Sequence, residues 1–159
     1  MEFYTIGVYN SSEKEFFDKL TNNNIDTFCD IRQRRGVRGS KYSFVNSNRL
    51  QEKLADLEIK YGHVLNLAPN DEIRNLQKNE DLNNGEKKRE REQLGDVFIS
   101  EYKNKILNKF DFNSFIEQLD DIGAKKVVFF CVEDHAKACH RSIVTKKLEE
   151  EYNYKITHL

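Results

Sequence analysis

The sequence predicts a single α/β domain whose mostly parallel β-sheet is flanked by helices on both faces. Short apolar runs alternate along the chain with segments in which apolar residues recur at helical spacing. This alternation favours a parallel sheet, because parallel strands are joined through crossover helices. A length of 159 residues suits one domain, and 7 glycines with 1 proline are too few for a disordered or linker-rich chain.

The first half of the chain contains three predicted strands and two predicted helices. Apolar runs predict the strands at residues 3–9, 25–31 and 61–67. Ser12 and Glu15 have the spacing of a capping box and predict the start of the first helix. Leucines at helical spacing mark the second helix, at positions 50, 54 and 57.

The second half adds a charged segment, three helices and two strands. Residues 71–95 carry many charges and few apolar side chains, which favours a solvated helical insertion interrupted at Asn83-Asn84-Gly85. Asp71 is the expected cap of its first helix, and Asn113 the expected cap of a later one. Apolar periodicity predicts helices around residues 98–106, 115–122 and 143–152. Apolar runs predict the last strands at 126–132 and 154–159.

The composition argues against several classes of protein. A formal net charge of −1 gives the whole molecule no attraction to nucleic acid or anionic lipid, so any such affinity must be local. No apolar stretch approaches the ~20 residues of a membrane span, and the N-terminus lacks the features of a signal peptide. The 3 cysteines form no disulfide framework. We therefore expect a cytoplasmic protein with reduced thiols and no membrane partner.

Reactive side chains gather where the predicted strands end. In a parallel sheet these carboxyl ends lie on one rim, where ligands bind. The fourth strand is followed by a joint rich in reactive groups, which precedes a helix whose N-terminal N–H groups favour anions. The catalytic candidates are Asp30, Glu133, Cys139 and His140. The ligand-binding candidates are Arg32, Arg34, Arg35, His63, Arg141 and Ser142.

The expected roles follow from the chemistry of these groups. Asp30 or Glu133 would act as general acid or base, with an imidazole from His140 or His63 as a second proton donor. Arg32 and Arg141 would clamp an anion. Buried charges are costly unless they are paired, so the alternative is a structural ion pair, Asp30 with Arg141 or Glu133 with Arg32.

Cys139 has two interpretations. At a helix N-terminus beside His140 and Arg141 its pKa should fall, which would make thiolate chemistry accessible. It is otherwise a small packing residue. The protein-phosphatase pattern of a cysteine and an arginine separated by five residues is absent, because one residue separates Cys139 from Arg141.

Soft metal ligands are also present, at Cys131, Cys139, His140 and His63. Their spacing matches no standard zinc knuckle, and adjacent residues such as Cys139 and His140 seldom bind one ion. We therefore expect neither a metal nor another cofactor.

The loop after the second strand is strongly basic. Residues 32–41 contain five positive charges and no acid, and Tyr42 and Phe44 follow. Cations and flexible glycines next to aromatic rings suit phosphate contact and base stacking. The alternative is an ordinary solvated loop.

Several motifs together resemble one known family, domain of unknown function 488. They are Tyr4-Thr5-Ile6-Gly7, Asp30-Ile31-Arg32, Tyr61-Gly62-His63, Cys131-Val132-Glu133 and Cys139-His140-Arg141-Ser142. The resemblance implies an α/β fold and a shared site at these positions, and it implies no particular reaction. Family members usually have a proline-and-serine loop where this chain has Gln33-Arg34-Arg35-Gly36.

The preferred interpretation is a protein that binds a phosphate-bearing ligand, a nucleotide or nucleic acid, at the rim. Whether it also turns the ligand over, as a hydrolase or transferase, is left open by the sequence. The first alternative is a non-catalytic nucleic-acid-binding module that uses loop 32–41. The second is a thiol-based redox or sulfur-transfer protein that uses Cys139.

Overall fold

The computed structural model describes residues 1–88 and 90–159, and these contain a five-stranded sheet. The strands are β1 (Glu2–Ile6), β2 (Thr27–Asp30), β3 (Lys60–His63), β4 (Lys126–Phe130) and β5 (Ile156–His158). They are ordered β3-β2-β4-β1-β5, and every neighbouring pair is parallel. The predicted fold class is therefore confirmed.

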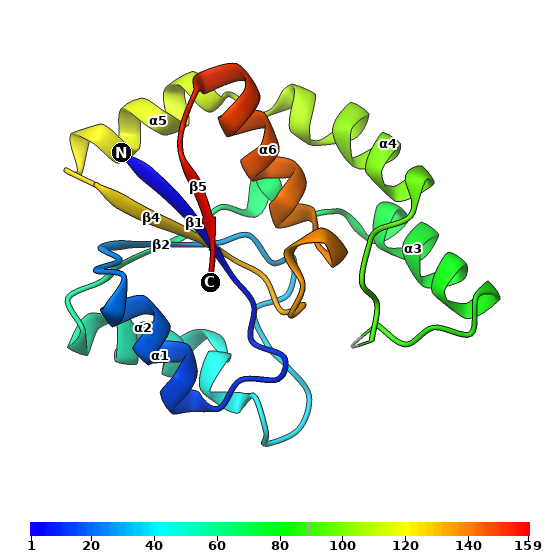
Figure 1. Ribbon diagram of the computed structural model, residues 1–159, viewed down its shortest axis with the longest axis horizontal. Helices are drawn as coiled ribbons and strands as arrows, with labels where there is room; N and C mark the ends of the chain where they lie inside the picture. The colour runs from blue at the N-terminus through cyan, green and yellow to red at the C-terminus, as the bar shows by residue number, and fades with distance from the viewer. Residues whose placement is uncertain (89) are drawn as a thin grey trace.

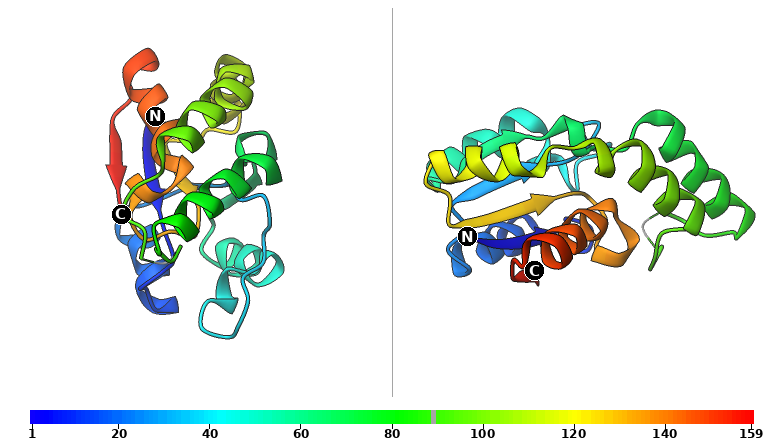
Figure 2. Two further views of the ribbon diagram at one scale, coloured as in Figure 1. Left: turned by 90° about the vertical axis from the view of Figure 1, so that its right-hand side faces the viewer. Right: turned by 90° about the horizontal axis from the view of Figure 1, so that it is seen from above.

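Helices cover both faces of this sheet (Figure 1). They are α1 (Glu13–Asn22), α2 (Ser47–Asp56), α3 (Asp71–Asn83), α4 (Asp96–Lys105), α5 (Phe112–Asp121) and α6 (His140–Tyr152). Helices α1 and α2 lie on one side, and α5 and α6 lie on the other. Figure 2 shows α3 projecting beyond the carboxyl ends of the strands. Across the described residues, no helix has both the length and the apolar character needed to cross a bilayer.

Alternating side chains of the strands build a core on each face of the sheet. Phe28 and Phe130 pack in the core under α1 and α2, whereas Cys29 and Phe129 pack in the core under α4, α5 and α6. This is the period-2 alternation of a strand whose two faces are both buried. It explains why the strands appear in the sequence as continuous apolar runs.

The strands are shorter than the apolar runs that predict them. The run after β4 continues through Cys131 and Val132, and both residues are buried outside the ladder. The run after β3 ends in a short 3₁₀ turn, Leu65–Leu67, in place of extended chain. Apolar side chains therefore continue into the joints at the rim, because these joints are packed against the core.

Two helix caps lie one or two residues before the expected positions. The capping box at Ser12 forms as predicted. Asn70 caps α3 in place of Asp71, and Asp111 caps α5 in place of Asn113. In both cases the side-chain oxygen accepts a backbone N–H three residues on, at 2.9 and 3.0 Å, which is the geometry that defines an N-cap.

The charged segment differs from the prediction in two ways. Its helix α3 stops at Asn83, as expected, but residues 86–88 and 90–95 are not helical. The segment is also not simply solvated, because Gln77, Asp81 and Arg91 are buried. Arg91 Nη1 lies 2.7 Å from Asp81 Oδ2, so the two charges neutralise each other inside the fold.

Candidate functional site

A cleft of about 830 Å³, here called the rim cleft, opens at the carboxyl ends of β2 and β4. Its walls come from the loop after β2, from α3, from the chain between α3 and α4, and from the loop after β4. Five predicted site residues line it: Arg32, Arg34, Glu133, Cys139 and His140. The other five are not among its lining residues: Asp30, Arg35, His63, Arg141 and Ser142.

Asp30 ends β2 and is fully buried beneath Arg32. Arg32 donates to both carboxylate oxygens, from Nε at 2.8 Å and from Nη2 at 2.7 Å, and its backbone N–H donates at 3.1 Å. The Tyr61 hydroxyl donates a further bond at 3.0 Å. Asp30 thus forms a structural ion pair, but the alternative that paired it with Arg141 is wrong, because its partner is Arg32. These contacts suit a carboxylate that orients Arg32.

Two of the three guanidinium nitrogens of Arg32, Nε and Nη2, have hydrogen-bond partners. Its Nη2 also donates to the Val45 carbonyl at 3.0 Å, and its guanidinium carbon lies 4.5 Å from the centre of the Phe130 ring. The remaining nitrogen, Nη1, is buried and has no hydrogen-bond partner within the described part of the chain. A buried donor without a partner costs about 1–3 kcal/mol, and Arg32 lines the rim cleft, so Nη1 is a donor whose hydrogen bond is not made within the protein.

Glu133 follows β4 and is buried among cations. Its Oε1 lies 3.2 Å from Lys88 Nζ and 3.5 Å from Arg91 Nη2, and its Oε2 accepts a bond of 3.1 Å from the Cys131 thiol. Burial by itself would raise the pKa of the Glu133 carboxyl, but Lys88, the thiol and nearby His140 lower it to about 2. Glu133 pairs with Lys88 and Arg91 and not with Arg32, so the alternative that paired it with Arg32 is also wrong.

Arg91 is a buried site residue that the sequence did not single out. Besides Asp81 and Glu133, it contacts the Ala138 carbonyl, to which Nη2 donates at 2.9 Å. Its Nε is buried with no hydrogen-bond partner in residues 1–88 and 90–159. Nothing distinguishes Arg91 in a run of charged residues, because its partners come from α3 and from the loop after β4.

Two thiols and one imidazole form a buried cluster on the rim cleft, made by Cys131, Cys139 and His140. Cys139 Sγ lies 3.6 Å from His140 Nδ1, and His140 Nε2 lies 3.0 Å from the Ile31 carbonyl. A carbonyl only accepts, so Nε2 carries a proton and the neutral ring presents the Nδ1 lone pair to the thiols. We call these three residues the thiol–imidazole cluster.

The environment shifts the pKa values within this cluster. The hydrogen bond to Cys139 and burial both raise the pKa of Cys131 well above its ordinary value. Burial opposes protonation of His140, but the nearby Cys131 and Glu133 outweigh it, so the pKa of His140 is raised. Within the cluster, the environment therefore favours the protonated forms of Cys131 and His140.

Arg141 and Ser142 hold the backbone around the rim cleft. The Arg141 guanidinium donates to the carbonyls of Glu133 and Asp134, at 2.5 and 2.6 Å. The Ser142 hydroxyl donates to the Cys139 carbonyl at 2.9 Å. Arg141 is 1% exposed, so its observed contacts are those of a residue that shapes the loop after β4, and not those of an anion clamp at the cleft surface.

The remaining candidates lie on either side of Arg32. His63 Nε2 is 2.9 Å from the Arg32 carbonyl. Arg35 bonds to Tyr61, and this hydrogen bond raises the pKa of the Arg35 guanidinium. Arg34 is exposed and lies 3.7 Å from Asp71 at the mouth of the rim cleft. Two neighbouring arginines of the basic loop therefore have different surroundings. Arg34 lines the rim cleft, whereas Arg35 contacts Tyr61 of β3.

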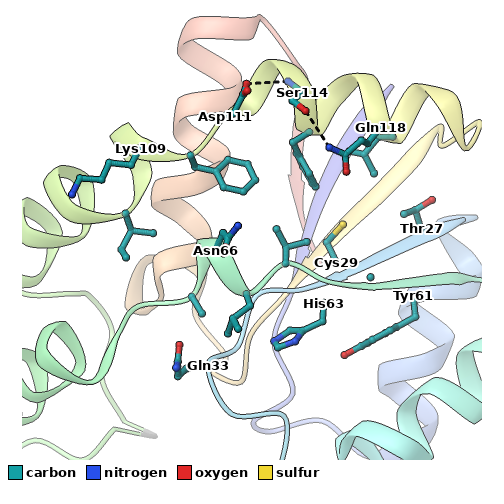
Figure 3. A pocket seen from close by; sticks show the side chains of 18 of the residues that line it. Thr27, Cys29, Gln33, Tyr61, His63, Asn66, Lys109, Asp111, Ser114 and Gln118 are labelled. Atoms are coloured by element: carbon teal, nitrogen blue, oxygen red, sulfur yellow. Dashed lines mark hydrogen bonds between the residues drawn. The ribbon is translucent and has the colours of Figure 1, made fainter.

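A second hollow, of about 950 Å³, lies beside the edge strand β3 and includes His63 (Figure 3). Its polar side chains on α5 are bonded to one another, since the Ser114 backbone donates to Asp111 and Gln118 donates to the Ser114 hydroxyl. Buried ionised groups line the rim cleft, whereas the charged residues of this hollow, Lys60, Lys105, Lys109 and Asp111, are not buried. The rim cleft is therefore the candidate functional site.

One of three comparisons with known proteins found a match. The model of the family described as "Domain of unknown function DUF488" matches residues 12–148. Tyr9 also lines the rim cleft, and it is the one lining residue outside this range. No curated protein matches the chain, and no solved structure matches it.

Proposed function

Because the chain belongs to the family Domain of unknown function DUF488, whose description states no activity, we propose a function from the geometry of the rim cleft. The protein binds a phosphate-bearing ligand there, a nucleotide or a nucleic acid. The observation that carries this proposal is Arg32, a buried guanidinium oriented by Asp30 that offers Nη1 as a donor. A guanidinium fixed in this way suits a phosphate oxygen.

The charge of the rim cleft supports the same ligand class. Among the described residues, seven cationic side chains line it: Arg32, Arg34, Arg38, Arg74, Lys78, Lys88 and Arg91. Three carboxylates line it: Asp71, Asp81 and Glu133. The net charge of the whole chain is −1, so this excess of cations is local. Local positive potential in a concave site attracts anionic ligands.

The groups beneath these cations suit hydrolysis or group transfer. Glu133 and His140 line the rim cleft and are of the residue types that orient nucleophiles and move protons. This part of the proposal concerns turnover and is separate from binding.

A non-catalytic nucleic-acid module is the second candidate, favoured by the exposure of Arg34 and Arg38 on the loop after β2. Single-stranded nucleic acid would contact both side chains and extend out of the rim cleft. Its affinity would then depend on salt more steeply than that of a single nucleotide, because more phosphates are neutralised.

Equilibrium binding of a fluorescent nucleoside triphosphate and of a labelled single-stranded oligonucleotide tests both candidates. The double variant Arg34→Gln/Arg38→Gln should weaken binding by at least tenfold and reduce the salt slope. Arg49→Gln/Lys53→Gln is the matched control, since it removes the same charge from α2, outside the rim cleft. No binding by the unmodified protein at low salt, or an equal loss in both variants, would contradict the proposal.

A further inference from the structure

We propose that the thiol–imidazole cluster is a metal site for a divalent cation of the zinc type. Cys131, Cys139 and His140 would each supply one ligand atom, and Glu133 would supply the fourth. The three ligand atoms lie within 4.8 Å of one another, and all three residues are buried. This inference does not depend on phosphate binding, which is argued from Arg32. It gives Glu133 and His140 the role of metal ligands in place of the proton transfer suggested above.

The separation between Cys139 Sγ and His140 Nδ1 fits tetrahedral coordination. A tetrahedral zinc ion with bonds of about 2.3 Å to sulfur and about 2.1 Å to nitrogen places those two atoms about 3.6 Å apart. Cys139 Sγ and His140 Nδ1 are 3.6 Å apart. Glu133 Oε2 accepts a hydrogen bond of 3.1 Å from Cys131 Sγ. It is not one of the atoms that all lie within 4.8 Å of one another, so the Glu133 side chain would have to move to supply the fourth ligand.

Adjacent residues can share one ion here because the backbone changes direction between them. Cys139 is the N-cap of α6 and has an extended conformation, with φ −142° and ψ 146°, whereas His140 is the first helical residue. The change from extended to helical backbone turns both side chains to the same side. The expectation that adjacent residues seldom bind one ion therefore does not apply to Cys139 and His140 at the start of α6.

The surroundings of His140 are those of a metal ligand. Its Nε2 donates to the Ile31 carbonyl, which fixes the ring and leaves the Nδ1 lone pair towards the thiols. Metal-bound histidines almost always have such a partner on the other ring nitrogen. Tyr102 packs beside the ring, at 5.5 Å between the two ring centres, and further limits its movement.

The charges of the site also balance. Two thiolates and the Glu133 carboxylate carry three negative charges, so a bound divalent cation leaves one negative charge, which faces Lys88 and Arg91. Binding releases the two thiol protons to solvent. Sulfur and imidazole ligands favour zinc over magnesium or calcium, which prefer oxygen. All four residues line the rim cleft, which provides an entry path for the ion.

Titration of the reduced, metal-free protein with Co²⁺ tests this site. We expect one equivalent to bind with a sulfur-to-cobalt charge-transfer band and the intense visible absorption of tetrahedral cobalt, and Zn²⁺ to displace it. Cys131→Ser and Cys139→Ser should each weaken binding beyond the roughly 10–100-fold effect of changes outside the ligand set. His140→Asn should do the same.

Cys29→Ser is the matched control, because Cys29 is a buried thiol on β2 that is outside the cluster and the rim cleft. Its cobalt spectrum should equal that of the unmodified protein. The proposal is overturned if the unmodified protein shows no charge-transfer band, or if Cys29→Ser loses metal as the cluster variants do. A protein that binds no metal after reduction but is isolated with a Cys131–Cys139 disulfide would likewise overturn it. The titration of the unmodified protein decides the matter even if a variant does not fold.

Discussion

At the scale of single residues, each buried carboxylate of the site is neutralised by named cations. Asp30 is paired with Arg32, and Glu133 is paired with Lys88 and Arg91. Removing one partner from a buried pair leaves an uncompensated charge in a poorly solvated place. These pairs therefore matter to stability as well as to the orientation of Arg32.

Asp30→Asn tests the pair beneath the rim cleft. It leaves the Arg32 guanidinium buried without its carboxylate, so the free energy of unfolding should fall by about 3–5 kcal/mol in a denaturant titration. Asp18→Asn is the control, because Asp18 pairs with Lys14 on the surface of α1. Its effect should stay within about 0.5 kcal/mol. A loss of unfolding free energy in Asp30→Asn that is as small as the loss in Asp18→Asn would show that the buried pair is not needed for stability.

At the scale of elements, the end of β1 and the loop after β4 are packed against each other without space between them. The backbone N–H groups of Val8 and Tyr9 both donate to the Val132 carbonyl. Gly7 lies against the Glu133 carbonyl, and a Cβ placed on Gly7 would be 1.9 Å from that oxygen. The missing side chain thus allows the close approach that brings Glu133 to the rim.

Gly7→Ala should therefore destabilise the protein. We expect a loss of about 2–3 kcal/mol from overpacking, which corresponds to a decrease in Tm of roughly 4–12 °C. Gly62→Ala is the matched control on β3, because no atom lies within 4 Å of a Cβ placed there. Thermal unfolding of both variants measures the difference. If the Tm of Gly7→Ala equals that of Gly62→Ala, the contact between β1 and the loop after β4 is not tight.

At the scale of the whole molecule, the charged segment lines the rim cleft. Arg91 connects α3, through Asp81, with the loop after β4, through Glu133 and the Ala138 carbonyl. The chain between α3 and α4 is thereby held over the rim cleft. Removing Arg91 should loosen this segment while the sheet and its two cores remain folded.

Arg91→Gln should increase hydrogen exchange at residues 77–88 and 90–95 by at least tenfold, or about 1.4 kcal/mol, since bonds to charged groups contribute that much. Exchange in β1 and β4 should not change. Lys87→Gln is the control, because Lys87 is exposed and pairs at 3.7 Å with exposed Glu90. An exchange pattern that is the same for both variants would mean that the segment is held by other contacts.

Much of this arrangement is predictable from local pattern. Apolar periodicity and the capping box at Ser12 predict the elements and their order, because these signals depend on neighbours in the chain. The parallel topology then places strand ends on one rim. That rule is sufficient to bring Arg32, Glu133, Cys139 and His140 to the same cleft.

The sequence by itself therefore determined the α/β fold, the family resemblance and the edge of the sheet at which the candidate site lies. Only the tertiary structure decided which charges pair, that Arg141 binds backbone carbonyls, and that Arg91 enters from the charged segment. The physical reason is that these interactions act over different separations along the chain. Periodicity and capping act within a few residues, whereas an ion pair depends on ångström-scale distances between side chains that loops bring together from distant parts of the chain.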